Sequence, residues 1–359
     1  MLYALVGKKL IRADEYVDNK QAFRCTGCGD AVRLRHGSVN IAHFAHINKQ
    51  CVFENEAESY EHLLGKLQLY QISKIIGQAQ VEVTFPSIKQ RADIVLKYKQ
   101  QKLILEYQCS PISIEQVKKR TQAYQTLGYK VIWLLGPKYA QNKITKKLLT
   151  KFNMPLLNFY NTKTQKITIR YNFNVIDFQS IKSATRELDL QRLLEVVNVS
   201  KNKLIWQDIV VSDDLLKQQG FKIQQLLVRK NLEWLKIQQE CYQQNHNLGG
   251  IPWICHPKRS MPVALNMSHI LWRCQCILFL EKYTIESIIT TASLQQIFIA
   301  IGRWLDVDSR FIKYVVNQFI IELVTNKFLI SISKGVLMLN SHPTWYQNWQ
   351  VKTNSLKLN

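Results

Sequence analysis

Two acidic residues stand where a β-strand is predicted and where burying a charge is unfavourable. Asp93 lies in the apolar run RADIVL, and Glu106 interrupts LILEYQ, with Gln108 two residues later on the same strand face. A buried charge needs a paired group or a metal ion, and two carboxylates on neighbouring strands repel each other unless a cation lies between them. The pattern therefore predicts that Asp93 and Glu106 bind Mg²⁺ or Mn²⁺ and activate a water molecule held by Gln108. The alternative is that both carboxylates pair with Arg or Lys side chains.

A second group of potential metal ligands lies near the start of the chain. Cys25 and Cys28 are separated by two residues and followed by a glycine, a spacing typical of a knuckle whose thiolates bind one ion. His43 and His46 are three residues apart and are expected to share one face of a helical turn. The four residues predict a tetrahedral Zn²⁺ site, with Cys51 as an alternative fourth ligand. A module that has lost its metal, or histidines packed in a core, would explain the same pattern.

The elements needed to position the two carboxylates are predicted on both sides of them. Apolar residues at helical spacing predict a helix over residues 54–77, and a capping box of Ser113 and Gln116 begins a second helix that ends at Gly128. Alternation and apolar runs predict strands over residues 80–86, 92–98, 102–108 and 129–135. This order of helix, three strands, helix and strand indicates an α/β core.

One face of the first predicted helix carries three polar residues four apart, Glu58, His62 and Lys66. A helix that precedes such a hairpin can bring one more carboxylate to the metal, and Glu58 is the candidate. His62 is favoured as a functional residue, because histidine is an uncommon choice for an exposed helix face. The alternative for Glu58 is a solvated face with Glu–Lys pairs.

Positive charge predicts a nucleic-acid partner. The formal net charge is +22, from 48 Lys and Arg against 26 Asp and Glu, and such an excess favours polyanions, above all DNA or RNA. On the second predicted helix, Lys119, Arg120 and Tyr124 are placed to contact a DNA phosphate or to brace the site, and Lys102 is a further candidate for DNA binding. The alternatives are a generally basic protein and, for Lys119, a solvated face.

The composition indicates a folded cytoplasmic protein with two or three domains. Hydrophobic residues make up 47% of the 359 residues, which argues against disorder. No apolar run approaches the ~20 residues of a membrane-spanning helix, and charged residues follow the short apolar start too closely for a signal peptide. The eight cysteines are therefore expected to be thiols or metal ligands.

The character of the sequence divides the chain into three predicted domains. Residues 1–53 carry the Cys and His motifs and predict a zinc-finger-like module. Residues 54–175 carry the α/β core, and residues 176–359 show apolar residues mainly at helical spacing. We expect the last segment to form an all-α C-terminal domain.

The order of these elements resembles the PD-(D/E)XK nuclease superfamily. More closely, the motifs CTGC, HFAH, ESYEH, RADI, EYQ and RTQAY resemble the competence protein CoiA family. The resemblance implies a cytoplasmic bacterial protein needed after DNA uptake in natural transformation, acting on incoming DNA at the recombination stage. It also implies a zinc-finger-like N-terminal part and an α/β core of PD-(D/E)XK nuclease type.

Two residues depart from the superfamily pattern. Ala92 replaces the proline before the first acidic residue, which matters little because only the carboxylate binds metal. Gln108 stands where the superfamily has a catalytic lysine, as it does in the CoiA-like pattern. Glutamine can orient water but carries no charge, so Lys102, on the same strand face, or Arg120 is expected to supply the missing cation.

Two functions are open at this point. The first is a Mg²⁺- or Mn²⁺-dependent nuclease that acts on single-stranded or branched DNA. The second is a non-catalytic factor of the same fold that binds DNA or recruits recombination proteins. A structural scaffold within a protein complex is a third possibility.

Overall fold

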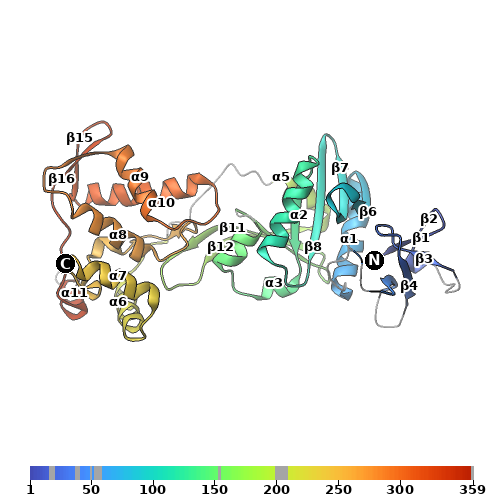
Figure 1. Ribbon diagram of the computed structural model, residues 1–359, viewed down its shortest axis with the longest axis horizontal. Coiled ribbons are helices and arrows are strands. Elements are labelled where there is room, and N and C mark those ends of the chain that lie inside the picture. Colours follow the sequence, from blue (N-terminus) through green and yellow to red (C-terminus); the bar gives the residue numbers. More distant parts are fainter. Residues whose placement is uncertain are drawn as a thin grey trace. The chain divides into compact units, whose positions relative to one another are not determined.

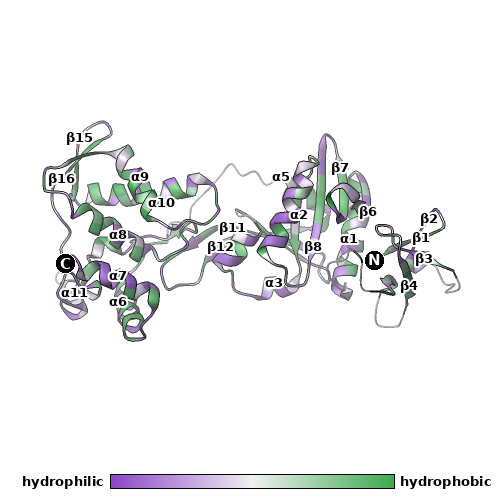
Figure 2. Ribbon diagram, viewed as in Figure 1, coloured by the Kyte–Doolittle hydropathy of each residue, from purple (hydrophilic) through white to green (hydrophobic). Residues whose placement is uncertain are grey.

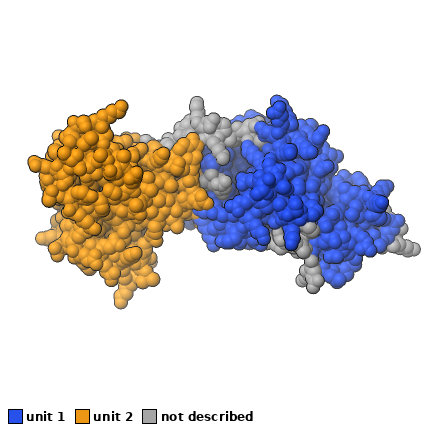
Figure 3. Space-filling model, turned by 45° about the horizontal axis from the view of Figure 1, so that its top comes forward, with its two compact units in different colours: residues 1–143, 147–171, 184–203 blue, residues 144–146, 172–183, 204–359 orange. Residues whose placement is uncertain are grey.

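The computed structural model describes residues 1–15, 21–36, 41–48, 51, 59–152, 155–198 and 209–356, with the backbone alone at residues 197 and 198. Its internal contacts divide the chain into two compact units (Figure 3). The first unit contains residues 1–143, 147–171 and 184–203, and the second contains residues 144–146, 172–183 and 204–359.

The first unit begins with a small antiparallel sheet whose strand order is β2-β1-β3-β4-β5 (Figure 1). Its strands are β1 (Tyr3–Val6), β2 (Lys9–Arg12), β3 (Phe23–Arg24), β4 (Ala31–Arg35) and β5 (His43–His46). Phe23 and Phe44 pack in its core, with ring centroids 4.9 Å apart. The segment that contains His43 and His46 is therefore a strand, and the predicted helical turn is wrong.

A larger mixed sheet follows, with the order β12-β11-β10-β9-β8-β7-β6. The β8–β9 and β9–β10 pairs are parallel, whereas β6–β7, β7–β8 and β10–β11 are antiparallel. The strands are β6 (Gln78–Phe85), β7 (Gln90–Tyr98), β8 (Gln101–Gln108), β9 (Lys130–Leu135), β10 (Leu157–Asn161), β11 (Lys166–Val175) and β12 (Lys182–Asp189). The helices that the chain forms between and after these strands are α2 (Ile114–Thr126), α3 (Pro137–Gln141), α4 (Lys146–Lys151) and α5 (Leu193–Asn198), and α1 (Tyr60–Ile76) precedes them.

Helices α1 and α2 cover opposite faces of this sheet. Leu103 and Leu105 of β8 pack in the same core as Leu69 of α1. Ile104, which lies between them in the strand, packs with Tyr124 of α2. Because successive side chains of a strand point to opposite faces, the apolar run of β8 supplies both cores.

The predicted order of helix, three strands, helix and strand is confirmed by α1, β6, β7, β8, α2 and β9. Helix α1 begins after Ser59, whose side chain accepts a hydrogen bond from the backbone N–H of His62. The capping box of Ser113 and Gln116 is present at the start of α2. These caps satisfy N–H groups that a helix terminus leaves unpaired, and they set which residues of each helix face the sheet.

The second unit is mainly helical, with α6 (Asp213–Val228), α7 (Leu232–Tyr242), α8 (His269–Leu280), α9 (Thr291–Ile301), α10 (Ser309–Thr325) and α11 (Trp349–Ser355). Helix α8 lies in the core, and the hydrophobic colour dominates its ribbon in Figure 2. A two-residue strand, β13 (Met261–Pro262), pairs with the end of β11. Among the residues that the structure describes, no helix has the length and hydrophobicity needed to cross a bilayer.

The prediction that residues 176–359 are all-α is wrong. An antiparallel sheet of order β14-β16-β15 lies within them, formed by β14 (Ile288–Thr290), β15 (Leu329–Ser333) and β16 (Val336–Leu339). The β15–β16 turn includes Gly335 at φ +77°, a conformation that glycine adopts without steric cost. The strands are short, so their alternation is weak beside the long helical runs around them.

Gly65 is required where α1 packs against the sheet. A methyl group at this position would lie 2.1 Å from Cε1 of Tyr107. We expect Gly65→Ala to lower the free energy of unfolding by about 1–3 kcal/mol through overpacking, although alanine is the better helix former. Chemical denaturation followed by circular dichroism measures the change. Gln71→Ala, on the exposed face of α1, should stay within about 0.5 kcal/mol, and equal stability of both variants would contradict the packing argument.

Candidate active site and metal centre

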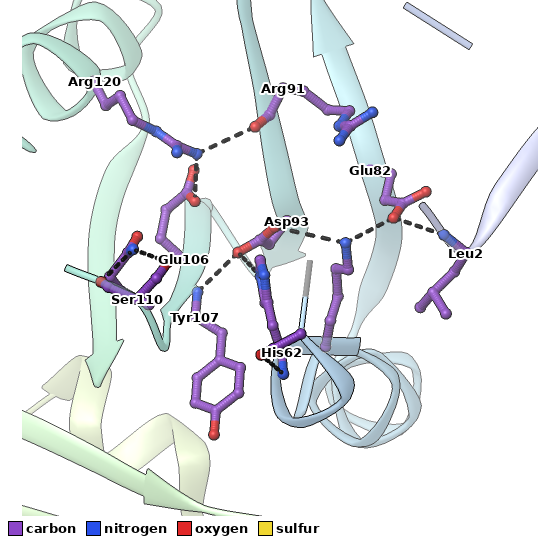
Figure 4. Close-up of polar contacts among 12 residues, drawn as sticks. Leu2, His62, Glu82, Arg91, Asp93, Glu106, Tyr107, Ser110 and Arg120 are labelled. Carbon is purple, nitrogen blue, oxygen red and sulfur yellow. Dashed lines mark hydrogen bonds and ion pairs between the residues drawn. The ribbon is translucent and has the colours of Figure 1, made fainter. Parts of the chain in front are cut away.

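Three carboxylates lie in a row across three neighbouring strands. The last pair of the β7–β8 ladder is Ile94 with Leu105, and Asp93 and Glu106 are the residues next to that pair on the two strands. On the other side, β6 pairs Val81 with Ile94 and Val83 with Ala92, which places Glu82 opposite Asp93. Figure 4 shows the three acidic side chains and their polar contacts.

Asp93 is held by donors from α1 and β8. Its Oδ2 lies 3.2 Å from Nε2 of His62 and accepts a hydrogen bond of 2.9 Å from the backbone N–H of Tyr107. Its Oδ1 lies 3.9 Å from Nζ of Lys66. Burial alone would raise the pKa of Asp93, but the positive charges of His62, Lys66 and Arg120 outweigh it and lower the pKa below its ordinary value. Asp93 is therefore ionised at neutral pH.

Glu106 has the opposite electrostatic environment. Its side chain is 2% exposed, and its Oε2 accepts a hydrogen bond of 2.6 Å from Arg120 on α2. Its other oxygen, Oε1, is buried and accepts no hydrogen bond of normal geometry, although the Tyr124 hydroxyl is close enough to the carboxylate to lower its pKa. Burial raises the pKa of Glu106 to about 7, with a further contribution from the charge of Asp93, while Arg120 acts in the other direction.

Lys66 and Glu82 connect this site to the first strand of the chain. Lys66 is fully buried and its Nζ lies 2.7 Å from Oε1 of Glu82. The Glu82 carboxylate also accepts hydrogen bonds from the backbone N–H groups of Leu2 at 2.8 Å and Tyr3 at 3.1 Å. Glu82 has φ +53°, which is uncommon for a residue other than glycine, and such strained positions concentrate at functional sites.

The structure brings only some of the predicted residues to the site. Gln108 is near it, but its Nε2 donates to the backbone oxygen of Ser110 at 2.8 Å. Arg120 forms an ion pair of 2.6 Å with Glu106. Lys102 pairs with Lys97 at the turn of the β7–β8 hairpin, about 13 Å along the strand from Glu106 at ~3.3 Å per residue. The prediction that Lys102 supplies the missing charge is therefore wrong, because sharing a strand face does not bring distant residues together.

The remaining predicted site residues differ in their exposure to solvent. Lys119 is exposed on α2 and available to a phosphate. Tyr124 has no exposed surface, so of its two predicted roles it braces the site and does not contact DNA. Glu58 lies outside the described residues.

Sequence reasoning missed Lys66 and Glu82 as parts of the site. The sequence places Lys66 on the same helix face as His62 but does not indicate that it contacts the carboxylates. Glu82 lies between two valines in the predicted strand QVEVTFP, and the argument that identified Asp93, a charge within a buried strand, applies to it equally.

The carboxylates suit a divalent metal ion. Oxygen ligands are those that Mg²⁺ and Mn²⁺ prefer, and Oε1 of Glu106 is a buried oxygen that accepts no hydrogen bond of normal geometry. Two carboxylates are enough for such an ion, because water and substrate phosphate usually complete its coordination. The ion pairs of Asp93 and Glu106 with basic side chains compensate the same charges, as the alternative interpretation of the sequence expected.

A separate group of ligand atoms lies in the N-terminal sheet. Cys25, Cys28, His46 and Cys51 each place one ligand atom within 4.8 Å of the others. Zinc bound by such ligands at ~2.3 Å would bring them to about 3.8 Å of one another, a small contraction. The Cys₃His set therefore fits Zn²⁺. Among the residues that the structure describes, no other three or more His, Cys, Asp or Glu side chains gather as closely.

The backbone shapes this cluster in two places. In the knuckle between β3 and β4, the N–H of Gly27 points to Sγ of Cys25 at 3.4 Å, and Gly29 adopts φ +79°. In β5, residues three apart lie on opposite faces. His46 accordingly approaches Sγ of Cys28 at 3.3 Å, while Nδ1 of His43 lies 2.8 Å from the backbone oxygen of Ile41. The prediction of His43 as a ligand is wrong, and Cys51, the alternative, takes its place.

Zinc analysis of single variants tests this ligand set. Gently purified protein should hold about one zinc ion per chain, and Cys28→Ser or Cys51→Ser should lose it during gel filtration because a thiolate ligand is removed. His43→Ala should retain the ion. Loss of zinc from His43→Ala, with retention in Cys51→Ser, would restore the Cys₂His₂ assignment.

The raised pKa of Glu106 predicts a pH-dependent stability in chelator. Folding raises this pKa from 4.5 to about 7, so the contribution of Glu106 is full below about pH 4.5 and is lost as the pH rises through 7. The wild type should lose up to about 3 kcal/mol between pH 5 and 8 relative to Glu106→Gln, since each pKa unit is worth about 1.4 kcal/mol.

Denaturant titrations at several pH values measure this difference. Glu187→Gln is the matched control, because the Glu187 side chain is 59% exposed, and its profile should parallel that of the wild type. A Glu106→Gln profile that is also parallel would show that Glu106 does not titrate abnormally.

Comparisons with known proteins agree with this geometry. Residues 8–54 match the family model of the competence protein CoiA N-terminal domain, and residues 58–213 match that of the competence protein CoiA nuclease-like domain. The competence protein CoiA of Bacillus subtilis (strain 168) is 31% identical over 154 residues. This match spans 42% of the present chain and 41% of the length of the relative. No solved structure gives a significant match.

The two family models together cover more than half of the chain. They include both the Cys₃His cluster and the sheet that carries Asp93 and Glu106. The chain therefore belongs to the competence protein CoiA family.

Proposed function

We propose that this protein processes incoming DNA at the recombination stage of natural transformation, as a divalent-metal-dependent nuclease with a PD-(D/E)XK-type core. The observation that carries the proposal is that Asp93 and Glu106, next to the last pair of the β7–β8 ladder, are close enough for the charge of Asp93 to raise the pKa of Glu106. The match to a nuclease-like domain over residues 58–213 supports the same reaction class.

The side chains of the site divide the work of phosphodiester hydrolysis. A Mg²⁺ or Mn²⁺ ion held by Asp93 and Glu106 would activate a water molecule and stabilise charge on the phosphate. Lys66, 3.9 Å from Asp93, keeps that carboxylate ionised and brings to the site the positive charge that Gln108 lacks. Arg120 pairs with Glu106 and opposes the rise in its pKa that burial causes. Gln108 orients water, and Glu58 adds a further carboxylate.

DNA binding is assigned to the basic surface. With a net charge of +22, the chain attracts the phosphate backbone without reading its sequence, and the exposed Lys119 lies on the helix next to the site. Single-stranded or branched DNA in the cytoplasm is the proposed substrate. The proposed organisation is a zinc-binding module over residues 1–53, the nuclease-like domain over 54–175 and a C-terminal domain over 176–359.

A second function is favoured by the ion pairs themselves. Both carboxylates are compensated by His62, Lys66 and Arg120, so the fold can bury them without a catalytic ion. The protein would then be a non-catalytic factor that binds DNA or recruits recombination proteins, with the nuclease-like fold as its scaffold.

Cleavage by matched variants separates the two functions. Purified full-length protein with Mn²⁺ should nick single-stranded or branched DNA, and Asp93→Asn should slow cleavage by about 100-fold or more, because a charged ligand of the reacting centre is lost. Asp214→Asn, whose side chain is 86% exposed on α6, should cleave at the wild-type rate.

Circular dichroism and DNA affinity complete the comparison. Asp93→Asn should remain folded and bind DNA. If the wild type cleaves no substrate and binds DNA as well as Asp93→Asn does, the nuclease proposal fails and the binding factor is supported.

A further inference from the structure

The second unit contains a cavity of about 960 Å³ that no step of the proposed reaction uses. It is lined by the end of α7 and the turn after it, by the residue that follows α8, and by the segment between β16 and α11. This volume is of the size that small-molecule sites have, ~300–1,000 Å³.

A hydrogen-bonded triad makes one wall of this cavity rigid. Glu281, after the end of α8, lies 2.8 Å from Nε2 of His246 through one carboxylate oxygen and accepts a hydrogen bond of 2.6 Å from Nε1 of Trp345 through the other. The His246 and Trp345 rings stack with their centroids 4.2 Å apart and their planes 4° from parallel. The carboxylate thus fixes two flat rings from segments distant in the sequence.

The rest of the lining combines an aromatic ring with amide groups. Tyr242 is 62% exposed at the end of α7, so its ring is accessible to a ligand. Gln244, Asn245 and Gln347 contribute side-chain amides, each of which offers both a donor and an acceptor. None of the described residues that line the cavity is Lys or Arg, although the chain as a whole is strongly basic.

We infer that this cavity binds an unpaired nucleobase of a DNA strand. A base presents a flat π-face, which stacks on aromatic rings, and an edge of donors and acceptors, which suits amide side chains. A phosphate group has neither, and the lining offers no Lys or Arg side chain for it. Base-paired DNA keeps its bases stacked inside the duplex, so the cavity selects single-stranded DNA.

This inference rests on the proposed handling of DNA only for its choice of ligand. It assigns to the second unit a contact with bases, whereas the site on β7 and β8 acts on the phosphodiester backbone. Binding measured in EDTA therefore tests it without any cleavage.

Full-length Tyr242→Ala provides the test, with Phe221→Ala as its control. Phe221 is also an exposed aromatic residue of this unit, 59% exposed on α6, and it does not line the cavity. Fluorescence anisotropy should be measured with three labelled probes of equal length: a thymidine strand, the same backbone without bases, and a duplex.

We expect Tyr242→Ala to weaken binding of the thymidine strand by about 10-fold, the loss typical of one stacked base. Binding of the abasic strand and of the duplex should not change, and the salt dependence should keep its slope because no phosphate contact is removed. Phe221→Ala should match the wild type on all three probes.

Two results would overturn the inference. The first is that Tyr242→Ala leaves binding of the thymidine strand unchanged. The second is that it weakens binding of all three probes equally, which would mean that the cavity does not distinguish bases. Both differ from a failure of the proposed DNA-processing role, in which the wild type would bind none of the probes at moderate salt.

Discussion

Three carboxylates in one row across β6, β7 and β8 set the main constraint on this fold. Glu82 and Asp93 lie between two register pairs of β6 and β7, Val81–Ile94 and Val83–Ala92, and Glu106 lies next to the last pair of β7 and β8. Neighbouring negative charges in a low-dielectric environment are unfavourable unless compensated. The charges of these residues are compensated by cations that approach both faces of the sheet. Lys66 of α1 forms an ion pair with Glu82, and Arg120 of α2 forms one with Glu106.

The compensation leaves the two candidate metal ligands in different states. Asp93, surrounded by donors and positive charge, has a lowered pKa, whereas the more enclosed Glu106 has a pKa near 7. A pair of carboxylates driven apart in this way is typical of sites that handle protons or metal ions. A structural ion-pair network can shift pKa values in the same way, so this geometry alone does not indicate a nuclease. The nuclease proposal therefore depends on the geometry together with the family match.

Glu82 gives the N-terminal sheet a part in this arrangement. Its carboxylate binds Lys66 and also the backbone N–H groups of Leu2 and Tyr3. The first strand of the chain therefore shares an acceptor with the lysine that approaches Asp93. A zinc ion that orders the N-terminal sheet would thereby also help to fix Lys66.

Local pattern in the sequence was enough to predict the order of α1, β6, β7, β8, α2 and β9. It also predicted that Asp93 and Glu106 lie within strands and that Cys25 and Cys28 form a knuckle. Alternation, apolar spacing and capping residues act within a few positions of the chain, so they can be read without the fold. Tertiary structure decided which groups meet. It brought Lys66 and not Lys102 to Asp93. It placed Cys51 rather than His43 in the cysteine and histidine cluster, because β5 is a strand, and it formed a short sheet in the second unit. These outcomes depend on strand register and on helices that pack from opposite faces, which are contacts between residues distant in the sequence.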